Sequence, residues 1–276
     1  MRKLFFLILI TALIGSCGSP DSIRIGGSTT VLPIITIAVE EFHDLYPDHK
    51  VLLNSGGSGV AINQVGAGQL HIGMISRDLT DEELGRHPDV EFTKHTIGRD
   101  AVLPVVSSEI FDAGIRVLSI NEMRMILTGE VSNWQQLGGP DREILVIDKE
   151  RSRGTRHVFM EAVMGDSEAS VPAAGLVLGA NNELQLAITQ SNSAFSMLSF
   201  AWQNEHVKGL AIKMEDGTVI EPSEENMRAG IYPIMRDIML LTNGRPEGKN
   251  GLFIDFILSE KGQEIIEQTG YVRISQ

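Results

Sequence analysis

Three short segments rich in glycine, serine and threonine are the parts of this chain whose residue types could do chemistry. They are residues 26–30, 55–59 and 154–155. Glycine lets a ligand oxygen approach the backbone, and serine and threonine hydroxyls donate further hydrogen bonds. This composition favours the binding of a small oxyanion.

Each segment follows a run that is typical of a strand and precedes a run with helical spacing. The strand-like runs are residues 23–25, 51–53 and 144–147, and the helical spacing follows within residues 31–45, 62–65 and 158–163. The start of a helix can hold an anion because it leaves N–H groups unpaired and carries a partial positive charge. One such turn alone is an ordinary cap, but three at the strand-to-helix corners of a sheet indicate a ligand site. The sequence therefore predicts an α/β fold with converging helix starts.

Basic side chains are concentrated around the third segment. Five of the 23 lysines and arginines lie within fifteen residues of one another, namely Arg142, Lys149, Arg151, Arg153 and Arg156. They either form a solvated loop or add positive charge beside a helix start. Arg77, after the apolar run 72–75, has two similar readings: it is exposed or paired with Asp78, or it makes a bidentate contact with a ligand. The sequence leaves these alternatives open.

Composition excludes several functional classes. The 276 residues include only 3 Tyr and 2 Trp, which argues against a site that stacks sugars or bases. The net charge of −13 argues against nucleic-acid binding. A single cysteine excludes a disulfide framework and cysteine-based zinc sites, and the seven histidines are scattered. We expect no metal, no cofactor and no catalytic residue.

The N-terminus has the pattern of a secretory signal. Arg2 and Lys3 precede an apolar run over residues 4–14, which is too short to span a bilayer as a stable helix. Residues 13–17 resemble a bacterial lipobox, which implies removal of residues 1–16 and lipidation of Cys17. The expected location is therefore the periplasm or the outer cell surface, with the protein anchored to a membrane by lipid.

Seven groups of residues, taken in order, resemble the phosphate-binding proteins of bacterial high-affinity phosphate ABC importers. They are residues 27–31, 57–59, 76–77, 126–129 with 133–134, 153–156, 232–236, and 253–259 with 262–263 and 270–272. The resemblance runs from about residue 23 to the C-terminus, and its strength lies in the order of the segments.

This resemblance implies a two-lobed periplasmic-binding-protein fold of type II, with a ligand cleft between mixed sheets flanked by helices. Lobe one is expected over residues 17–103 plus 233–276, and lobe two over residues 104–232. The implied function is to bind inorganic phosphate and deliver it to the permease and ATPase subunits of an importer, as a monomer. The implied phosphate-binding residues are Ser28, Thr29, Thr30, Ser58, Arg77, Arg153, Gly154 and Thr155.

Three positions depart from the family pattern. Arg153 stands where the family usually has serine, Lys149 where arginine is common, and Arg77 where some members carry an aspartate that accepts the proton of phosphate. Asp100, Asp148 or a backbone carbonyl is then left to accept that proton, so selectivity over sulfate stays open.

Two other functions remain as alternatives. One is the binding of another tetrahedral oxyanion, or phosphate sensing without transport. The other, from a different class, is a phosphoester hydrolase or phosphoryl-transfer enzyme, although residues 56–60 lack the final glycine of a hydrolase nucleophile elbow.

Overall fold

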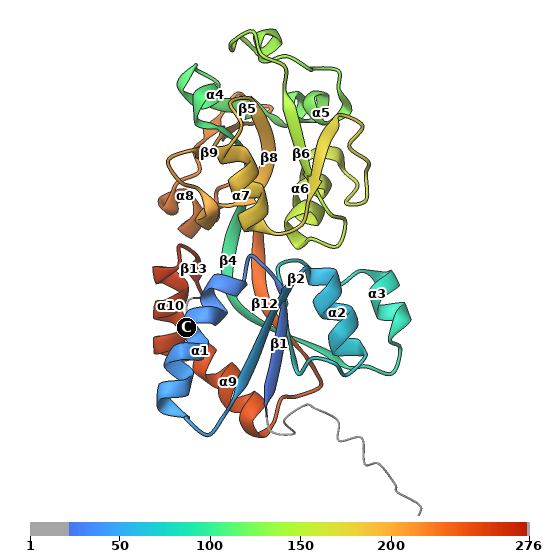
Figure 1. Cartoon of the computed structure of the whole chain (residues 1–276), viewed down its shortest axis with the longest axis vertical. Helices are drawn as coiled ribbons and strands as arrows, with labels where there is room; N and C mark the ends of the chain where they lie inside the picture. The colour runs from blue at the N-terminus through green and yellow to red at the C-terminus, as the bar shows by residue number, and fades with distance from the viewer. Residues whose placement is uncertain (1–21, 275–276) are drawn as a thin grey trace, which may run out of the picture.

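Two lobes joined by the long strands β4 (Phe92–Ser107) and β12 (Met235–Asn243) make up the computed structural model, which describes residues 22–274 (Figure 1). The expected two-lobed α/β fold is confirmed. The expected signal peptide, residues 1–16, and the lipidation site Cys17 lie outside the described residues. Within residues 22–274, no helix is long and apolar enough to cross a membrane.

The first lobe contains the first two of the predicted strand–turn–helix units. Its elements are β1 (Ile23–Ser28), α1 (Leu32–Leu45), β2 (Val51–Gly56), α2 (Ser58–Gly66), β3 (Ile72–Ile75), α3 (Asp81–Arg86), α9 (Gly248–Leu258), α10 (Glu260–Gln268) and β13 (Val272–Arg273). Strands β2, β1 and β3 are parallel neighbours, and β12 pairs with β3 in the antiparallel sense. Because these strands are parallel, the turns after β1, β2 and β3 all emerge at one edge of the sheet.

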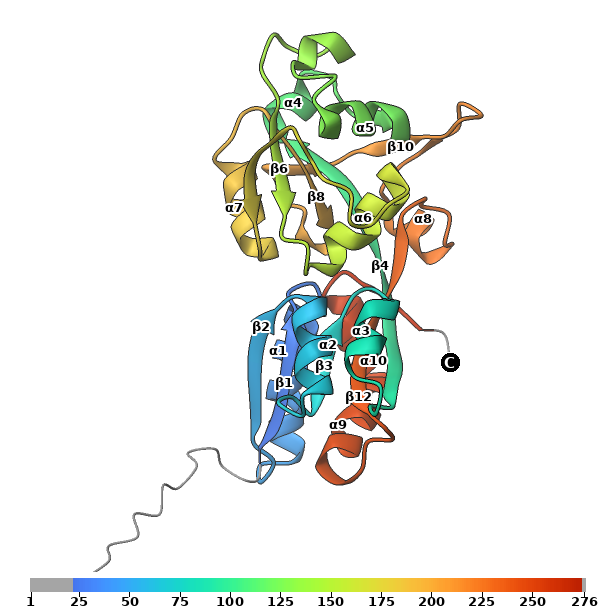
Figure 2. The same ribbon diagram turned by 90° about the vertical axis from the view of Figure 1, so that its right-hand side faces the viewer.

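The second lobe contains the third predicted unit, in β6 and α6. Its elements are α4 (Ser108–Asp112), β5 (Val117–Ser119), α5 (Ile120–Thr128), η1 (Trp134–Leu137), β6 (Leu145–Lys149), α6 (Gly154–Met164), β7 (Ala174–Leu178), α7 (Asn181–Thr189), β8 (Ala194–Ser199), η2 (Phe200–Trp202), β9 (Val207–Gly209), β10 (Ala211–Lys213), β11 (Val219–Ile220) and α8 (Glu224–Arg228). Strand β6 runs parallel to both β7 and β8, so the turns after β6 and β7 emerge together. Figure 2 shows α6 at the face of this lobe that meets the first lobe.

One sheet runs through both lobes in the order β2-β1-β3-β12-β4-β8-β6-β7. The hydrophobic core nevertheless divides into separate clusters. Buried residues from Ala101 to Ile234 pack in the second lobe, while those up to Ile97 and from Ile238 onward pack in the first. The chain therefore passes from one cluster to the other within β4, between Ile97 and Ala101, and near the start of β12, between Ile234 and Ile238. The expected lobe boundaries at 103/104 and 232/233 stay a prediction.

Gly27 holds the first turn in place at the end of β1. Its φ of 131° lies in the region that favours glycine, and an added Cβ would strike the Met74 carbonyl oxygen and come within 2.5 Å of Ala61 Cβ. No other residue type fits between β3 and α2 at this point.

We therefore expect Gly27→Ala to lower the free energy of unfolding by about 3 kcal/mol, because backbone strain and overpacking add. Gly68→Ala is the matched control, since Gly68 also has a positive φ of 69° but nothing within 4 Å of an added Cβ. Urea denaturation of both variants measures the difference, and equal losses of about 1 kcal/mol would show that the close approach at Gly27 does not matter.

Candidate anion-binding site

Five hydroxyl groups from four segments of the chain meet where the two lobes touch. Ser28 Oγ lies 2.9 Å from Ser76 Oγ, which lies 3.4 Å from Ser58 Oγ. Thr30 Oγ1 of the first lobe lies 3.3 Å from Thr155 Oγ1 of the second. All five side chains are buried. The structure thus brings the three predicted turns together in one place.

Helix N-termini surround these hydroxyls. Helix α2 begins at Ser58 and α6 at Gly154, and a Cβ on Gly154 would come within 2.5 Å of both Ser58 Oγ and Ser76 Oγ. Glycine is needed at 154 because the start of α6 lies directly against these two serines. The unpaired N–H groups and partial positive charges of both helix starts therefore face the same small volume.

A third helix start, that of α7, joins this arrangement from the second lobe. Asn181, the first residue of α7, donates from Nδ2 to Thr30 Oγ1 at 3.2 Å and from its backbone N–H to Thr29 Oγ1 at 3.4 Å. Thr29, predicted from the sequence, thus joins the site through a residue of the other lobe.

Lys149 is a buried cation that joins the site through Asn181. It is the last residue of β6, its exposed fraction is 1%, and its Nζ donates to Asn181 Oδ1 at 2.9 Å. Among residues 22–274, no carboxylate lies within ion-pair distance of this ammonium group. Burial, followed by repulsion from Arg153 and Arg236, lowers the pKa of Lys149 to about 7.

Arg236 links the crossing strands to the hydroxyls. It donates from Nε and Nη2 to Asp100 Oδ2 at 3.0 and 2.6 Å, and from Nη2 to Thr30 Oγ1 at 3.1 Å. Ser199 donates to the other oxygen of Asp100 at 2.8 Å. Burial raises the pKa of Asp100, while the Arg236 guanidinium opposes that rise. Both oxygens of the Asp100 carboxylate therefore already accept hydrogen bonds.

Asp148, the acid next to Lys149 in the chain, is also paired. Arg156 Nε donates to its two oxygens at 3.0 and 3.2 Å, and the Lys149 backbone N–H donates to Oδ1 at 2.7 Å. Both candidate proton acceptors that the sequence indicated, Asp100 and Asp148, are thus engaged by arginines. Asp100 and Asp148 therefore do not balance the positive charge of Lys149.

Arg77 forms a buried ion pair within the first lobe. Its Nη1 and Nη2 donate to the two carboxylate oxygens of Glu83 at 2.8 and 2.7 Å, and both side chains are buried. Burial would raise the pKa of Glu83, but the bonds from Arg77 and Thr80 outweigh it and hold that pKa below its usual value. The bidentate contact of Arg77 is therefore made to Glu83, and its Nη1 also donates to the Asp78 carbonyl at 2.7 Å. The expected contact of Arg77 with phosphate stays a prediction.

Arg153 closes the site from its rim. Its Nε and Nη2 donate to Glu150 Oε2 at 2.8 and 2.6 Å, and its Nη1 reaches the Gly56 carbonyl of the other lobe at 2.6 Å. Close by, the Gly59 N–H donates to the Ser152 carbonyl at 3.1 Å. These bonds join the second and third turns across the two lobes.

Four residues of the site are absent from the predicted set of phosphate-binding residues. Ser76 and Arg236 lie in segments that match the family but are given no part in binding, and Lys149 is noted only among five clustered basic residues and as a departure from the family pattern. Asn181 is missed altogether, because the turn before α7 contains no serine or threonine. The sequence feature that could have identified this helix start is a strand over 174–178 followed by Gly179, with Glu183 a few residues later. Glu183 accepts a bond from the Ala180 N–H, as in a capping box.

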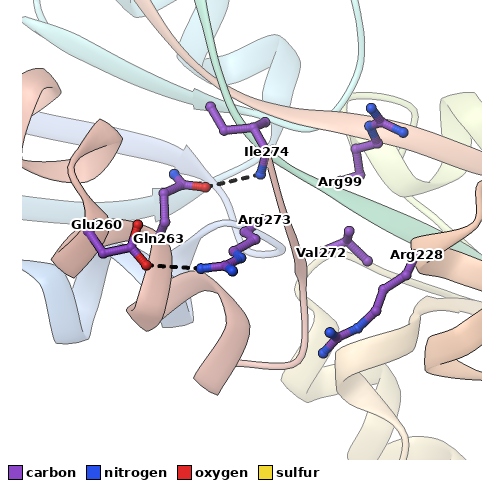
Figure 3. A pocket seen from close by; sticks show the side chains of 7 residues that line it. All are labelled: Arg99, Arg228, Glu260, Gln263, Val272, Arg273 and Ile274. Atoms are coloured by element: carbon purple, nitrogen blue, oxygen red, sulfur yellow. Dashed lines mark hydrogen bonds and ion pairs between the residues drawn. The ribbon is translucent and has the colours of Figure 1, made fainter. Parts of the chain in front are cut away.

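A separate hollow of about 420 Å³ lies between α8, α10 and β13 (Figure 3). Arg99, which lines it, is exposed next to the buried Asp100, so the two side chains point to opposite faces of β4. The three arginines that line this hollow are all paired: Arg99 with Asp237 at 3.9 Å, Arg273 with Glu260 at 3.1 Å and Arg228 with Glu267 at 2.7 Å. This hollow is distinct from the cluster of hydroxyls.

Comparison with known proteins gives relatives across the whole chain. A family model described as a PBP superfamily domain matches residues 16–261. The phosphate-binding protein PstS of Borreliella burgdorferi is 32% identical, with 99% of each chain covered. PstS of Bacillus subtilis is 30% identical over 92% of this chain and 81% of that protein.

Solved structures agree with these relatives. A proposed phosphate ABC transporter substrate-binding protein from Clostridium perfringens, with bound phosphate, superposes with a TM-score of 0.82 at 27% identity, covering 92% of this chain and all of that one. An ABC-type phosphate transport receptor from Vibrio cholerae gives 0.72 at 26% identity, covering 91% of this chain and all of that one.

We expect Arg77→Met to lower the free energy of unfolding by about 3–5 kcal/mol, because it leaves the buried Glu83 carboxylate unpaired. Arg77→Met with Glu83→Gln should recover much of the loss, since glutamine is neutral and keeps an acceptor for Thr80. The pKa of Glu83 is lowered on folding, so the ion pair stabilises fully above the ordinary glutamate pKa of about 4.5, and this stabilisation disappears as the pH falls through the lowered value.

Urea denaturation between pH 3 and 7 measures these effects. Unchanged stability of Arg77→Met, together with a tenfold or larger loss of anion binding, would show that Arg77 contacts the ligand after all.

Proposed function

The chain belongs to the PstS family of phosphate-binding proteins within the PBP superfamily, and on that basis we propose that it binds inorganic phosphate between its lobes and delivers it to an ABC importer. Its relatives are binding proteins for phosphate, and a phosphate ABC importer is named for the structural neighbours. The chain is accordingly a transport protein and not an enzyme.

The observation that carries this proposal is the buried Lys149 ammonium group beside a cluster of hydroxyls. An unpaired buried cation is strongly unfavourable, and an anion placed next to it removes that penalty. The hydroxyls of Thr30 and Thr155 now bond to each other at 3.3 Å. A tetrahedral oxyanion among them exchanges such neutral bonds for stronger charge-assisted ones.

Each part of the site then has a distinct task. Hydroxyl groups and helix N–H groups donate to the phosphate oxygens, Gly154 allows the close approach of α6, and Lys149 supplies charge. The residues that we propose bind phosphate are Ser28, Thr29, Thr30, Ser58, Ser76, Lys149, Gly154, Thr155 and Asn181. Arg236 orients Thr30, because its Nη2 donates to the hydroxyl oxygen and leaves the hydroxyl proton directed elsewhere.

Closure of the two lobes encloses the ion. The bonds from Arg153 to Gly56, from Gly59 to Ser152 and from Asn181 to Thr30 all cross between lobes, so opening must break them. We place the hinge in β4 and near the start of β12, with lobe one as residues 17–103 plus 233–276 and lobe two as 104–232. We further propose that the chain is exported, is lipid-anchored through Cys17, and acts as a monomer that meets the permease and ATPase subunits at the membrane.

Titration calorimetry with phosphate, sulfate and molybdate tests the choice of ligand. We expect phosphate to bind with a dissociation constant far below about 1 mM and more tightly than the other two anions. Tighter binding of sulfate or molybdate would instead support the alternative of another tetrahedral oxyanion. Phosphate binding no tighter than millimolar would contradict the proposal.

Thr155→Val tests the role of the hydroxyl on α6. We expect the dissociation constant for phosphate to rise about tenfold or more, as for the loss of a hydrogen bond to a charged group. The melting temperature without ligand should stay close to that of the wild type, because within residues 22–274 the hydroxyl bonds only to Thr30 across the lobes. Thr36→Val, on the exposed face of α1, is the matched control. A large fall in melting temperature would identify Thr155 as a structural cap.

A further inference from the structure

We propose that this chain takes up a proton at Lys149 when it captures phosphate, so that the site adjusts its own charge to the presence of the ion. The inference rests on the proposed function and deepens it. In chemical terms, the neutral ε-amine of the empty site accepts one proton from the buffer as the anion enters. No other bond is formed or broken.

Within residues 22–274, no acid forms an ion pair with the Lys149 ammonium group. The side chain is buried, and its hydrogen-bond acceptor is the neutral amide oxygen of Asn181. That amide is itself held in orientation, since its Nδ2 donates to Thr30 Oγ1 of the other lobe. An ammonium group has three N–H donors, and a phosphate oxygen beside Nζ would give the remaining donors an ionised acceptor.

The charged groups that face Lys149 come from each element packed against it. Two are cations: Arg153 at the start of α6 and Arg236 on β12. Two are acids: Glu150, half-exposed and bonded to Arg153, and Glu183, exposed on α7 and bonded to backbone N–H groups. The acids are more exposed to solvent than the arginines, so their support is more strongly screened.

The acids in the neighbouring ion pairs do not balance the charge of Lys149, because each is paired with an arginine. Asp148 is held by Arg156, and Asp100 is held by Arg236. Burial and the two facing arginines therefore lower the pKa of Lys149 to about 7. With that pKa, the amine of the closed site without an anion is largely neutral at pH 8 and largely charged at pH 6.

A bound phosphate reverses this preference. An anion in contact with Nζ stabilises the charged form and raises the pKa of Lys149, so the amine becomes charged at pH 8 as well. Arginine at this position could not follow this cycle, because its guanidinium stays protonated at every pH of interest. The lysine lets the empty, closed site avoid an unpaired buried charge and restores that charge when the ion is present.

Calorimetry of phosphate binding in buffers with different ionisation enthalpies measures the protons taken up. The full chain is compared with Lys149→Arg, because phosphate's own protonation is common to both and cancels in the difference. At pH 8 we expect the wild type to take up about 0.9 proton more than the variant, and at pH 6 only about 0.1. Lys213→Arg, at an exposed lysine, should match the wild type.

The same comparison predicts how affinity changes with pH. Because the empty site of the wild type must first gain a proton, the ratio of the wild-type dissociation constant to that of Lys149→Arg should rise about tenfold per pH unit above pH 7. Equal proton uptake by both proteins at pH 8, or a ratio that does not change with pH, would overturn the proposal. Failure of both proteins to bind phosphate would instead contradict the proposed function.

Carbon-13 NMR of the lysine Cε groups tests the wild type directly, whether or not Lys149→Arg binds phosphate. The resonance that is missing in the variant identifies Lys149. It should titrate with a midpoint near pH 7 without phosphate and keep its charged position to pH 9 with phosphate. A resonance that stays charged to pH 9 without phosphate would overturn the proposal.

Discussion

The rest of this structure depends on one unbalanced charge, the Lys149 ammonium group buried where the two lobes meet. The acids nearby are committed to arginines: Asp148 to Arg156 and Asp100 to Arg236. A buried cation without an acid is unfavourable unless an anion joins it or it loses its proton. In the proposed cycle, Lys149 loses its proton when the site holds no anion and regains it when phosphate binds.

The backbone supplies most of the remaining recognition. Parallel strands in each lobe place the turns after β1, β2 and β6 at the junction, and glycines 27 and 154 let those turns pack closely. A chain with a net charge of −13 can bind an anion because the local field comes from helix starts and one lysine, and not from its overall charge. The cross-lobe bonds then make recognition inseparable from closure.

The sequence predicted the parts of the site that have a local pattern. Glycine, serine and threonine between a strand and a helix identify residues 26–30, 55–59 and 154–155, because capping chemistry is local. The partners of charged residues are not set by a local pattern, so Arg77 was expected at a ligand while its Nη1 and Nη2 each donate to Glu83, six residues on. Asn181 was missed because its contacts join segments far apart in the sequence: Lys149 lies on a neighbouring strand of the same lobe, and Thr30 lies in the other lobe.

A crystal structure of the chain grown with phosphate is the most direct test of this account. It predicts a tetrahedral ion within hydrogen-bond distance of the Ser28, Ser58 and Thr155 hydroxyls and of Lys149 Nζ. Phosphate bound elsewhere, with Thr30 and Thr155 still hydrogen-bonded to each other, would contradict it.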